Sequence, residues 1–176
     1  MAVANFGLGT LGMAEAFNER ALSEGKAARY SEVAAEIAAV LDGEPNPVAR
    51  MATVAAMLAQ SFDAFFWTGF YVVDPDKPRE LVVGPYQGSL GCLRIAFGRG
   101  VCGTAARERQ TQVVEDVEAF PGHIACDSRS KSEIVVPVVD TEGRLIAVFD
   151  VDSDRPAAFD EVDREWLERI LGSVFG

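Results

Sequence analysis

The three cysteines of this chain are the side chains most suited to redox chemistry. Cys126 lies in the polar segment "PGHIACDSRSKSE" (residues 121–133), whereas Cys92 and Cys102 have small and apolar neighbours. A thiol becomes reactive when it is accessible and lies near cations that favour the thiolate; Arg129 and Lys131 can supply such cations, whereas Asp127 opposes them. The sequence therefore predicts a reactive thiol at Cys126. For Cys102, the role of a small buried hydrophobic residue fits equally well.

Three acidic residues are a second set of candidate catalytic groups. Glu133 opens a strand-like segment directly after the Cys126 segment, and Asp150 and Asp152 alternate in "AVFDVDS", so both point to one face of a strand. If the two strands are neighbours, the three carboxyl groups converge. Grouped carboxylates raise the pKa of at least one member, which keeps a proton available, and they attract an ammonium group. Carboxylates at solvated strand ends are the alternative.

Further features indicate a binding pocket without defining its ligand. The glycine-rich "FGRGVCGTA" can hold an anion such as a carboxylate where it enters a helix, but it lacks the Gly-Lys-Ser/Thr of a phosphate-binding loop. Trp67 and Tyr71 share a strand face and either line a pocket or pack in a core. His123 either pairs with Cys126 or braces the loop. No metal is predicted, because the cysteines have no C-x₂-C spacing.

The pattern of elements around these residues is typical of an α+β domain. Helical periodicity covers residues 14–25, 30–43, 46–62 and 160–175, and strand-like segments cover residues 65–73, 80–88, 92–97, 111–116, 133–139 and 144–152. Short turns between the strands favour a central antiparallel sheet with N- and C-terminal helices packed on it. We expect residues 1–12 to be a loose lead-in and residues 13–176 to form one domain. In the last helix, the spacing places Val162, Trp166, Ile170 and Val174 inward.

Composition limits the classes of partner. The 176 residues include 27 acidic and 16 basic side chains, a net charge of −11. This charge repels nucleic acid and anionic membrane surfaces, so neither is expected as a partner. The N-terminal segment has no basic region typical of a secretion signal, and an odd number of cysteines argues against a disulfide framework. We therefore expect a cytoplasmic protein whose thiols do redox work.

Several motifs together resemble the free methionine-(R)-sulfoxide reductases, which are stand-alone GAF domains. They are "WTGFYV", the continuous segment from "GPYQGSLGCLRIAFGRGVCGTA" through "FPGHIACDSRSKSEIVVPVV", then "GRLIAVFDVDS" and "FDEVDREWLE". The resemblance extends from about Ala34 to the C-terminus. One departure is Glu118, where the family often has histidine. The resemblance implies a GAF-like fold and reduction of free L-methionine-(R)-sulfoxide to methionine.

The resemblance also assigns roles to individual residues. It implies that Cys126 attacks the sulfoxide sulfur and becomes a sulfenic acid, and that Cys92, or else Cys102, resolves it as a disulfide. Glu133 is the candidate proton donor, and Asp150 and Asp152 are candidate ligands of the substrate ammonium group. The remaining predicted substrate-binding residues are Trp67 at the S-methyl end and Tyr71 in the pocket wall, with backbone amides near Ile124, Asp127 or Gly103 at the carboxylate. No bound cofactor is expected; thioredoxin is the implied external reductant, and a homodimer is the form in which GAF domains commonly occur.

Two other functions are compatible with the same residues. A GAF domain can bind a small ligand without catalysis, although we expect such a sensor to need an effector domain, which a partner chain could supply. A cysteine-based redox sensor would form the disulfide without turning over a sulfoxide. Consumption of NADPH in an assay coupled to thioredoxin, with each sulfoxide epimer, separates the enzyme from both alternatives.

Overall fold

The computed structural model describes residues 9–124 and 126–176, with side chains from residue 24 onward. The elements in chain order are α1 (Gly9–Val40), α2 (Pro47–Ser61), β1 (Trp67–Asp74), β2 (Lys77–Gln87), β3 (Arg94–Ala96), α3 (Gly100–Glu108), β4 (Gln112–Val114), the 3₁₀ helix η1 (Val117–Ala119), β5 (Ser132–Val139), β6 (Leu145–Ser153) and α4 (Glu161–Phe175). Among the helices of the described residues, none combines the length and the apolar character that a membrane span requires.

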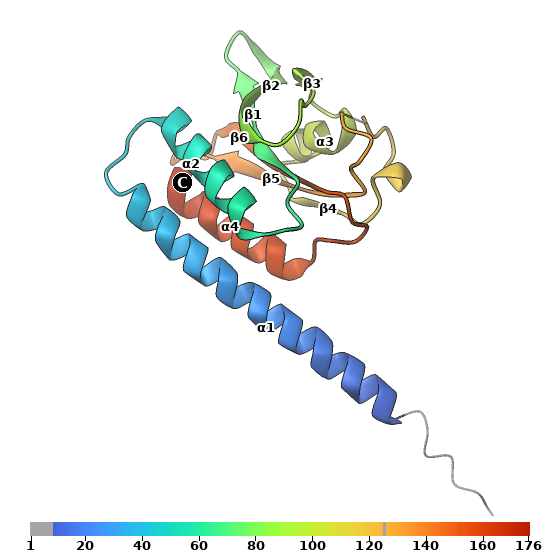
Figure 1. The fold of residues 1–176 in the computed structure, drawn as a ribbon. Coiled ribbons are helices and arrows are strands. Elements are labelled where there is room, and N and C mark those ends of the chain that lie inside the picture. Colours follow the sequence, from blue (N-terminus) through green and yellow to red (C-terminus); the bar gives the residue numbers. More distant parts are fainter. Residues whose placement is uncertain (1–8, 125) are drawn as a thin grey trace, which may run out of the picture.

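The six strands form one antiparallel sheet in the order β3-β2-β1-β6-β5-β4. Helices α1, α2 and α4 lie together on one face of the sheet, and α3 lies on the other (Figure 1). The prediction of an α+β fold with an antiparallel sheet and terminal helices packed on it is therefore confirmed. Because side chains alternate along a strand, each face of the sheet has its own set of inward residues.

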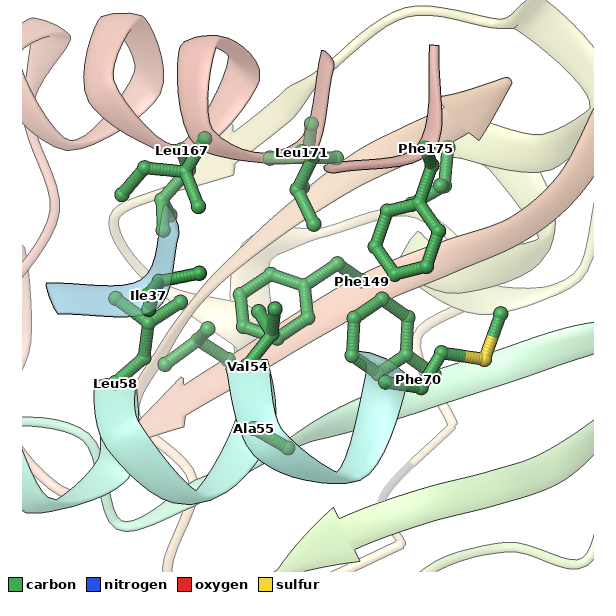
Figure 2. Close-up of a cluster of buried hydrophobic side chains, with 14 of the residues drawn as sticks. Ile37, Val54, Ala55, Leu58, Phe70, Phe149, Leu167, Leu171 and Phe175 are labelled. Carbon is green, nitrogen blue, oxygen red and sulfur yellow. The ribbon is translucent and has the colours of Figure 1, made fainter. Parts of the chain in front are cut away.

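The face under the three long helices is the larger apolar core. Val54 and Leu58 of α2 meet Phe70 of β1, Phe149 of β6 and Leu167 of α4, all of them fully buried (Figure 2). The other face carries a smaller core in which Val101, Ala105 and Ala106 of α3 pack over strands β5 and β6. Polar and acidic side chains lie beside this second core. The sheet therefore separates a purely structural face from the face that carries the candidate reactive groups.

The N-terminal helix differs from its prediction. Helix α1 begins at Gly9 and continues without a break to Val40, where two shorter helices were predicted; residues 1–8 lie outside the described residues. The chain also passes through Gly25 without ending the helix. A glycine in a helix interior costs only about 1 kcal/mol, which the packing of the helix on α2 and α4 offsets.

The face of α4 is also shifted from the prediction. Ile170 is buried as expected, but Val162, Trp166 and Val174 are only half-buried. The centre of the buried face is formed by Leu167, Leu171 and Phe175, each one residue further along the chain. Helix α4 packs between α1 and the sheet, so residues at the edge of its apolar face also have apolar neighbours. The predicted stripe follows this edge and not the centre of the face.

A polar cluster connects α1 to the start of α4. The side chain of Asp163 is buried, with only 1% of the residue exposed. It accepts a hydrogen bond from Tyr30 Oη (2.8 Å) and forms an ion pair with Lys26 Nζ (2.7 Å). Its other role is in the capping box with Asp160, where the backbone amide of Asp160 donates to Asp163 Oδ2. A single buried carboxylate thus joins the two helices and caps one of them.

Replacing Asp163 with alanine should lower the free energy of unfolding by about 3 kcal/mol, because it leaves a buried hydroxyl and an ammonium group without their shared acceptor. Urea unfolding measures this change. The matched control is Asp154→Ala, whose side chain is 62% exposed, and it should change stability by less than about 0.5 kcal/mol. Equal stabilities of the two variants would contradict this assignment.

Candidate active site

Strand register brings the three predicted acidic residues together. Asp152 of β6 lies directly opposite Glu133 of β5 on one side and opposite Trp67 of β1 on the other. Asp150 lies one pair further along, opposite Gly69 of β1. All three carboxyl groups therefore project from the α3 face of the sheet into one small region.

Burial and mutual repulsion act on the acidity of this cluster. Burial is the main cause that raises the pKa of Glu133 well above its ordinary value, and the charges of Asp150 and Asp152 add to it. The pKa of Asp150 is raised for the same reasons, burial first and Asp152 next. Burial also raises the pKa of Asp152, to about 6. The cluster therefore keeps protons at neutral pH.

One carboxyl oxygen of the cluster has no partner within the described part of the chain. Asp150 is 5% exposed, and its Oδ1 atom accepts no hydrogen bond there. A buried acceptor without a donor is costly, so this atom is suited to receive a donor from a ligand. An ammonium group would supply such a donor.

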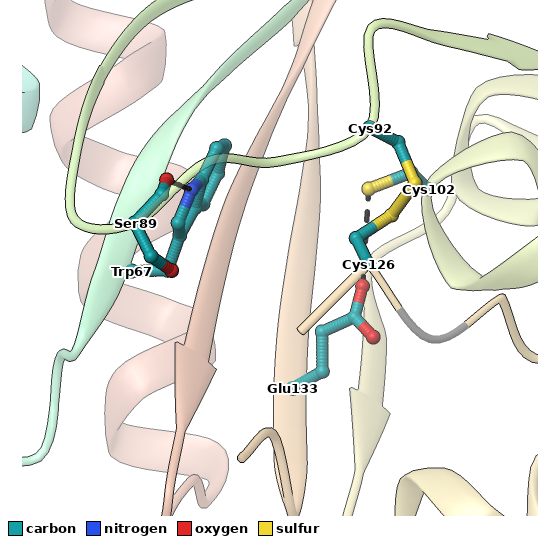
Figure 3. The surroundings of a disulfide bond; sticks show 6 residues. All are labelled: Trp67, Ser89, Cys92, Cys102, Cys126 and Glu133. Atoms are coloured by element: carbon teal, nitrogen blue, oxygen red, sulfur yellow. Dashed lines mark hydrogen bonds between the residues drawn. A yellow bond between two sulfur atoms is a disulfide. The ribbon is translucent and has the colours of Figure 1, made fainter. Parts of the chain in front are cut away.

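Cys102 is the free thiol of the described residues, and it lies on the acidic cluster. It is 4% exposed near the start of α3, and its Sγ lies 3.8 Å from Glu133 Oε1, to which it donates (Figure 3). Burial, followed by the charges of Asp150 and Glu133, raises the pKa of this thiol well above its ordinary value. Cys102 is thus a neutral hydrogen-bond donor and is poorly disposed to act as a thiolate.

Cys92 and Cys126 form a disulfide at the mouth of the same region (Figure 3). Their Cα atoms are 5.3 Å apart, although 34 positions separate them in the sequence. Cys126 is exposed, as its polar neighbours predict, and Cys92 is half-buried in the loop between β2 and β3. The structure therefore pairs the predicted reactive thiol, Cys126, with Cys92 and leaves Cys102 free.

A pocket joins these groups. It is lined by all the predicted site residues except Cys92 and Gly103, namely Trp67, Tyr71, Cys102, Ile124, Cys126, Asp127, Glu133, Asp150 and Asp152. Its free cavity volume is about 30 Å³, which is room for only two or three waters. In this disulfide-bonded state the pocket is nearly filled.

Gly103 is a correction to the predicted set. Its backbone amide donates to the Arg99 carbonyl within α3, so it is not available to hold a carboxylate. A Cβ atom at this position would clash with the Ala96 carbonyl oxygen, so glycine is needed there for close packing. Gly100 and Val101, at the start of α3, line the pocket instead. Amides in the first turn of a helix have no intrahelical acceptor, so they are suited to hold an anion.

Two residues that cover the pocket were not predicted from the sequence. Leu90 and Gly91, in the loop that carries Cys92, line the pocket from above. A Cβ atom at Gly91 would lie 2.9 Å from Tyr71 Oη and 3.2 Å from the Trp67 ring, so the loop lies directly on these aromatic side chains. The two glycines of "GSLGC" are the sequence signal for such a close approach.

His123 lies in the pocket wall, and its backbone amide donates to the Phe120 carbonyl. Burial lowers the pKa of the imidazole, and Glu118 opposes this effect only partly. The disulfide of Cys126 is with Cys92, so a pair between His123 and Cys126 is not needed to explain the site.

Comparison with known proteins assigns the family. The GAF domain family model matches residues 46–174. The chain belongs to the GAF domain family. "GAF domain-containing protein A" of Dictyostelium discoideum is 50% identical over 146 residues, which cover 83% of this chain and 90% of that protein. A protein of Saccharomyces cerevisiae named free methionine-R-sulfoxide reductase is 41% identical over 133 residues, covering 73% of this chain and 74% of the relative.

Among solved structures of this GAF family, the free methionine-R-sulfoxide reductase of Neisseria meningitidis in complex with its substrate is 49% identical to this chain. It superposes with a TM-score of 0.80 and covers 85% of this chain and 87% of its own. Within the GAF family, the chain therefore groups with the free methionine-R-sulfoxide reductases, as the cysteine motifs predict.

Proposed function

We propose that this protein reduces free L-methionine-(R)-sulfoxide to methionine, with Cys126 as the attacking thiol. The observation that carries the proposal is the disulfide between Cys92 and Cys126 at the mouth of a pocket with three buried acidic residues. The reductases named among its relatives support the same substrate. A bare ligand-binding GAF domain requires neither the paired thiols nor the protonated acid.

The first chemical step is an oxygen transfer. The sulfur of Cys126 attacks the sulfoxide sulfur, the sulfoxide oxygen gains protons, and Cys126 ends as a sulfenic acid while methionine leaves. The sulfoxide sulfur is reduced by two electrons and the cysteine sulfur is oxidised by two. The thiol of Cys92 then attacks the sulfenic sulfur, which gives the disulfide and one water.

The acidic cluster supplies the proton in this proposal. Sulfoxide oxygen is a poor leaving group unless it is protonated, so the reaction needs an acid within reach of it. Glu133 is our candidate, because its raised pKa keeps the carboxyl group protonated at neutral pH. The thiol of Cys102 donates to Glu133 Oε1, which orients the carboxyl group.

Two charged subsites account for the choice of a free amino acid. We assign the ammonium group to Asp150 and Asp152, where the orphaned Asp150 Oδ1 lacks a donor. The substrate carboxylate is assigned to backbone amides at the start of α3, at Gly100 and Val101, together with those around Ile124. Trp67 and Tyr71 form the apolar wall for the S-methyl end. A methionine sulfoxide blocked at both ends should accordingly be a poor substrate.

The reduced protein is the form that takes substrate in this scheme. A cavity of about 30 Å³ under the disulfide is too small for a whole amino acid, so opening of the Cys92–Cys126 bond must precede binding. An external dithiol performs that reduction by exchange, and we assign this part to thioredoxin. Such recycling requires a reducing compartment, so the cytoplasm is the expected location.

The test is an assay coupled to thioredoxin, its reductase and NADPH, run with each epimer of free methionine sulfoxide. NADPH consumption with the R epimer, and much less with the S epimer, is the expected result. A ligand sensor would consume none. A redox sensor would be reduced once and then stop, whichever epimer is present, and either outcome would overturn the proposal.

The pH dependence of substrate capture follows from Asp152. Its pKa of about 6 means that the carboxyl group ionises as the pH rises through that value, and only the ionised form pairs with the substrate ammonium group. We expect kcat/KM to rise between about pH 5 and 7, with an apparent pKa of about 6. In Asp152→Asn this acidic limb should be lost and KM should rise by about tenfold or more. An unchanged acidic limb in the variant would exclude Asp152 as its source.

A further inference from the structure

A second connection, made without cysteine, joins the two loops of the disulfide. Ser89 Oγ donates to Asp127 Oδ2 at 2.6 Å. Arg129 holds both oxygens of the same carboxylate, with Nε at 3.1 Å from Oδ1 and Nη2 at 2.8 Å from Oδ2. We call Ser89, Asp127 and Arg129 the loop latch.

The loop latch is anchored at both ends. The guanidinium group of Arg129 lies over the ring of Phe66, 4.8 Å from its centroid. On the other side, Trp67 Nε1 donates to the carbonyl of Ser89 at 3.0 Å (Figure 3). Hydrogen bonds from Arg129 and then Ser89 hold the pKa of Asp127 well below its ordinary value, so the carboxylate stays ionised as an acceptor. Phe66 and Trp67 are adjacent in the chain, so the loop latch is tied to the start of β1.

The position of the loop latch relates it to the two sulfurs. Ser89 precedes Cys92 by three residues in one loop, and Asp127 directly follows Cys126 in the other. The bonds of the loop latch involve no sulfur, so reduction of the disulfide does not break them chemically. Among them, the hydrogen bond from Ser89 to Asp127 is the side-chain hydrogen bond that connects the two loops in the described part of the chain, and Arg129 holds its acceptor in place.

We propose that Ser89 and Arg129 are positioning residues for closure of the disulfide: they hold the Cys92 loop against the Cys126 loop while both sulfurs are free. This inference rests on the proposed function, because it assigns a role within the same reaction. Closure forms the S–S bond between Cys92 and the sulfenic sulfur of Cys126 and releases that oxygen as water. Its rate depends on how often the two sulfurs meet, which is the effective concentration of one loop at the other.

The variant Ser89→Ala removes the hydroxyl group that donates to Asp127. It keeps the backbone carbonyl of residue 89 that accepts the hydrogen bond from Trp67. Ser89 does not line the pocket, so formation of methionine in a first turnover should change by less than about twofold. Closure should slow by about tenfold, the effect of losing a hydrogen bond to a charged acceptor. The sulfenic acid of Cys126 should then accumulate and be trapped by dimedone, which quenched mass spectrometry measures.

A second measurement separates positioning from a general loss of structure. In glutathione buffers the Cys92–Cys126 disulfide of Ser89→Ala should form with an equilibrium constant about tenfold lower, equivalent to a reduction potential about 30 mV higher. Ser89→Thr keeps a hydroxyl and should restore both closure and the equilibrium. Ser128→Ala is the matched control, since Ser128 is an exposed serine of the same loop outside the loop latch. Arg129→Gln removes the bidentate pair and should show the same two defects as Ser89→Ala.

The outcomes distinguish this inference from the proposed function. If the wild-type protein forms no methionine from either epimer, the proposed function fails. If the wild-type protein is active but Ser89→Ala closes its disulfide at the wild-type rate with an unchanged equilibrium, the loop latch has no positioning role. An equal fall in first-turnover methionine formation and closure would also overturn the inference, since it would place Ser89 in the shape of the pocket.

Discussion

Replacing Cys126 with serine is expected to abolish the reduction of methionine sulfoxide, by roughly 10³-fold or more in kcat. A serine hydroxyl cannot take up the sulfoxide oxygen to give a sulfenic acid, so the first step has no substitute acceptor in the pocket. Cys102 does not replace it, because burial raises the pKa of its thiol and keeps it neutral. Chromatographic measurement of methionine in a single turnover tests this directly.

Cys92→Ser is the informative companion to this variant. With Cys126 intact and no external reductant, it should form about one methionine per chain, because oxygen transfer proceeds and only closure of the disulfide is lost. Cys126→Ser should form none. If Cys126→Ser retained the first turnover while Cys102→Ala lost it, the attacking sulfur would have to be reassigned to Cys102.

The geometry of the acidic cluster was predictable from strand periodicity and one short turn. The period of two places Asp150 and Asp152 on one face, and the "DTEG" turn between the last two strands makes β5 and β6 neighbours. Together these facts bring Glu133 opposite Asp152. Strand register is strongly specified when one face is buried, so this part of the site is encoded locally.

The contact between Cys92 and Cys126 depends on loop packing and not on strand periodicity. Both cysteines lie in loops without periodicity, and contacts between irregular loops depend on particular side chains such as Ser89 and Asp127. The sequence supplied the candidate pair only through resemblance to a family. The position of Leu90 and Gly91 over the pocket was not predicted for the same reason. The loop packs closely on Trp67 and Tyr71, and the only sign of this contact in the sequence is the glycine that it requires.

The structural helices show the reverse case, in which a local signal is overridden by packing. Gly25 marks a helix end in the sequence, yet α1 runs through it because its C-terminal half is packed against α2 and α4. The buried face of α4 is centred on Leu167 and Leu171 because the helix has apolar neighbours on more than one side. Periodicity predicts that a helix is amphipathic, but its neighbours determine which residues lie at the centre.

Glu133→Gln is expected to lower kcat by about 10²–10³-fold while changing KM much less, because it removes the proton donor and preserves the shape of the side chain. Glu133 is 6% exposed and sits between Cys102 and Asp152, where a glutamine amide occupies the same space. An interaction made only as the sulfoxide oxygen departs affects the chemical step and not substrate capture. Steady-state kinetics with the free R epimer separates the two constants.

The sign of the pH effect gives this prediction a second readout. The pKa of Glu133 is raised in the folded protein, so the carboxyl group is protonated at neutral pH and loses its proton only as the pH rises through that raised value. In the wild-type protein kcat should therefore hold at neutral pH and fall on the alkaline side. Glutamine does not titrate, so Glu133→Gln should be slow at every pH and lack this alkaline limb.

The control for charge alone is Glu118→Gln, which removes a carboxylate that is 76% exposed and pairs with Lys131 outside the pocket. It should leave kcat within about twofold of the wild-type value, since an exposed ion pair contributes little. If Glu133→Gln also stayed within threefold and kept the alkaline limb, the proton would have to come from Asp150, the other buried carboxyl group whose pKa is raised well above its ordinary value. In that case Glu133 would serve only to accept the hydrogen bond from the Cys102 thiol.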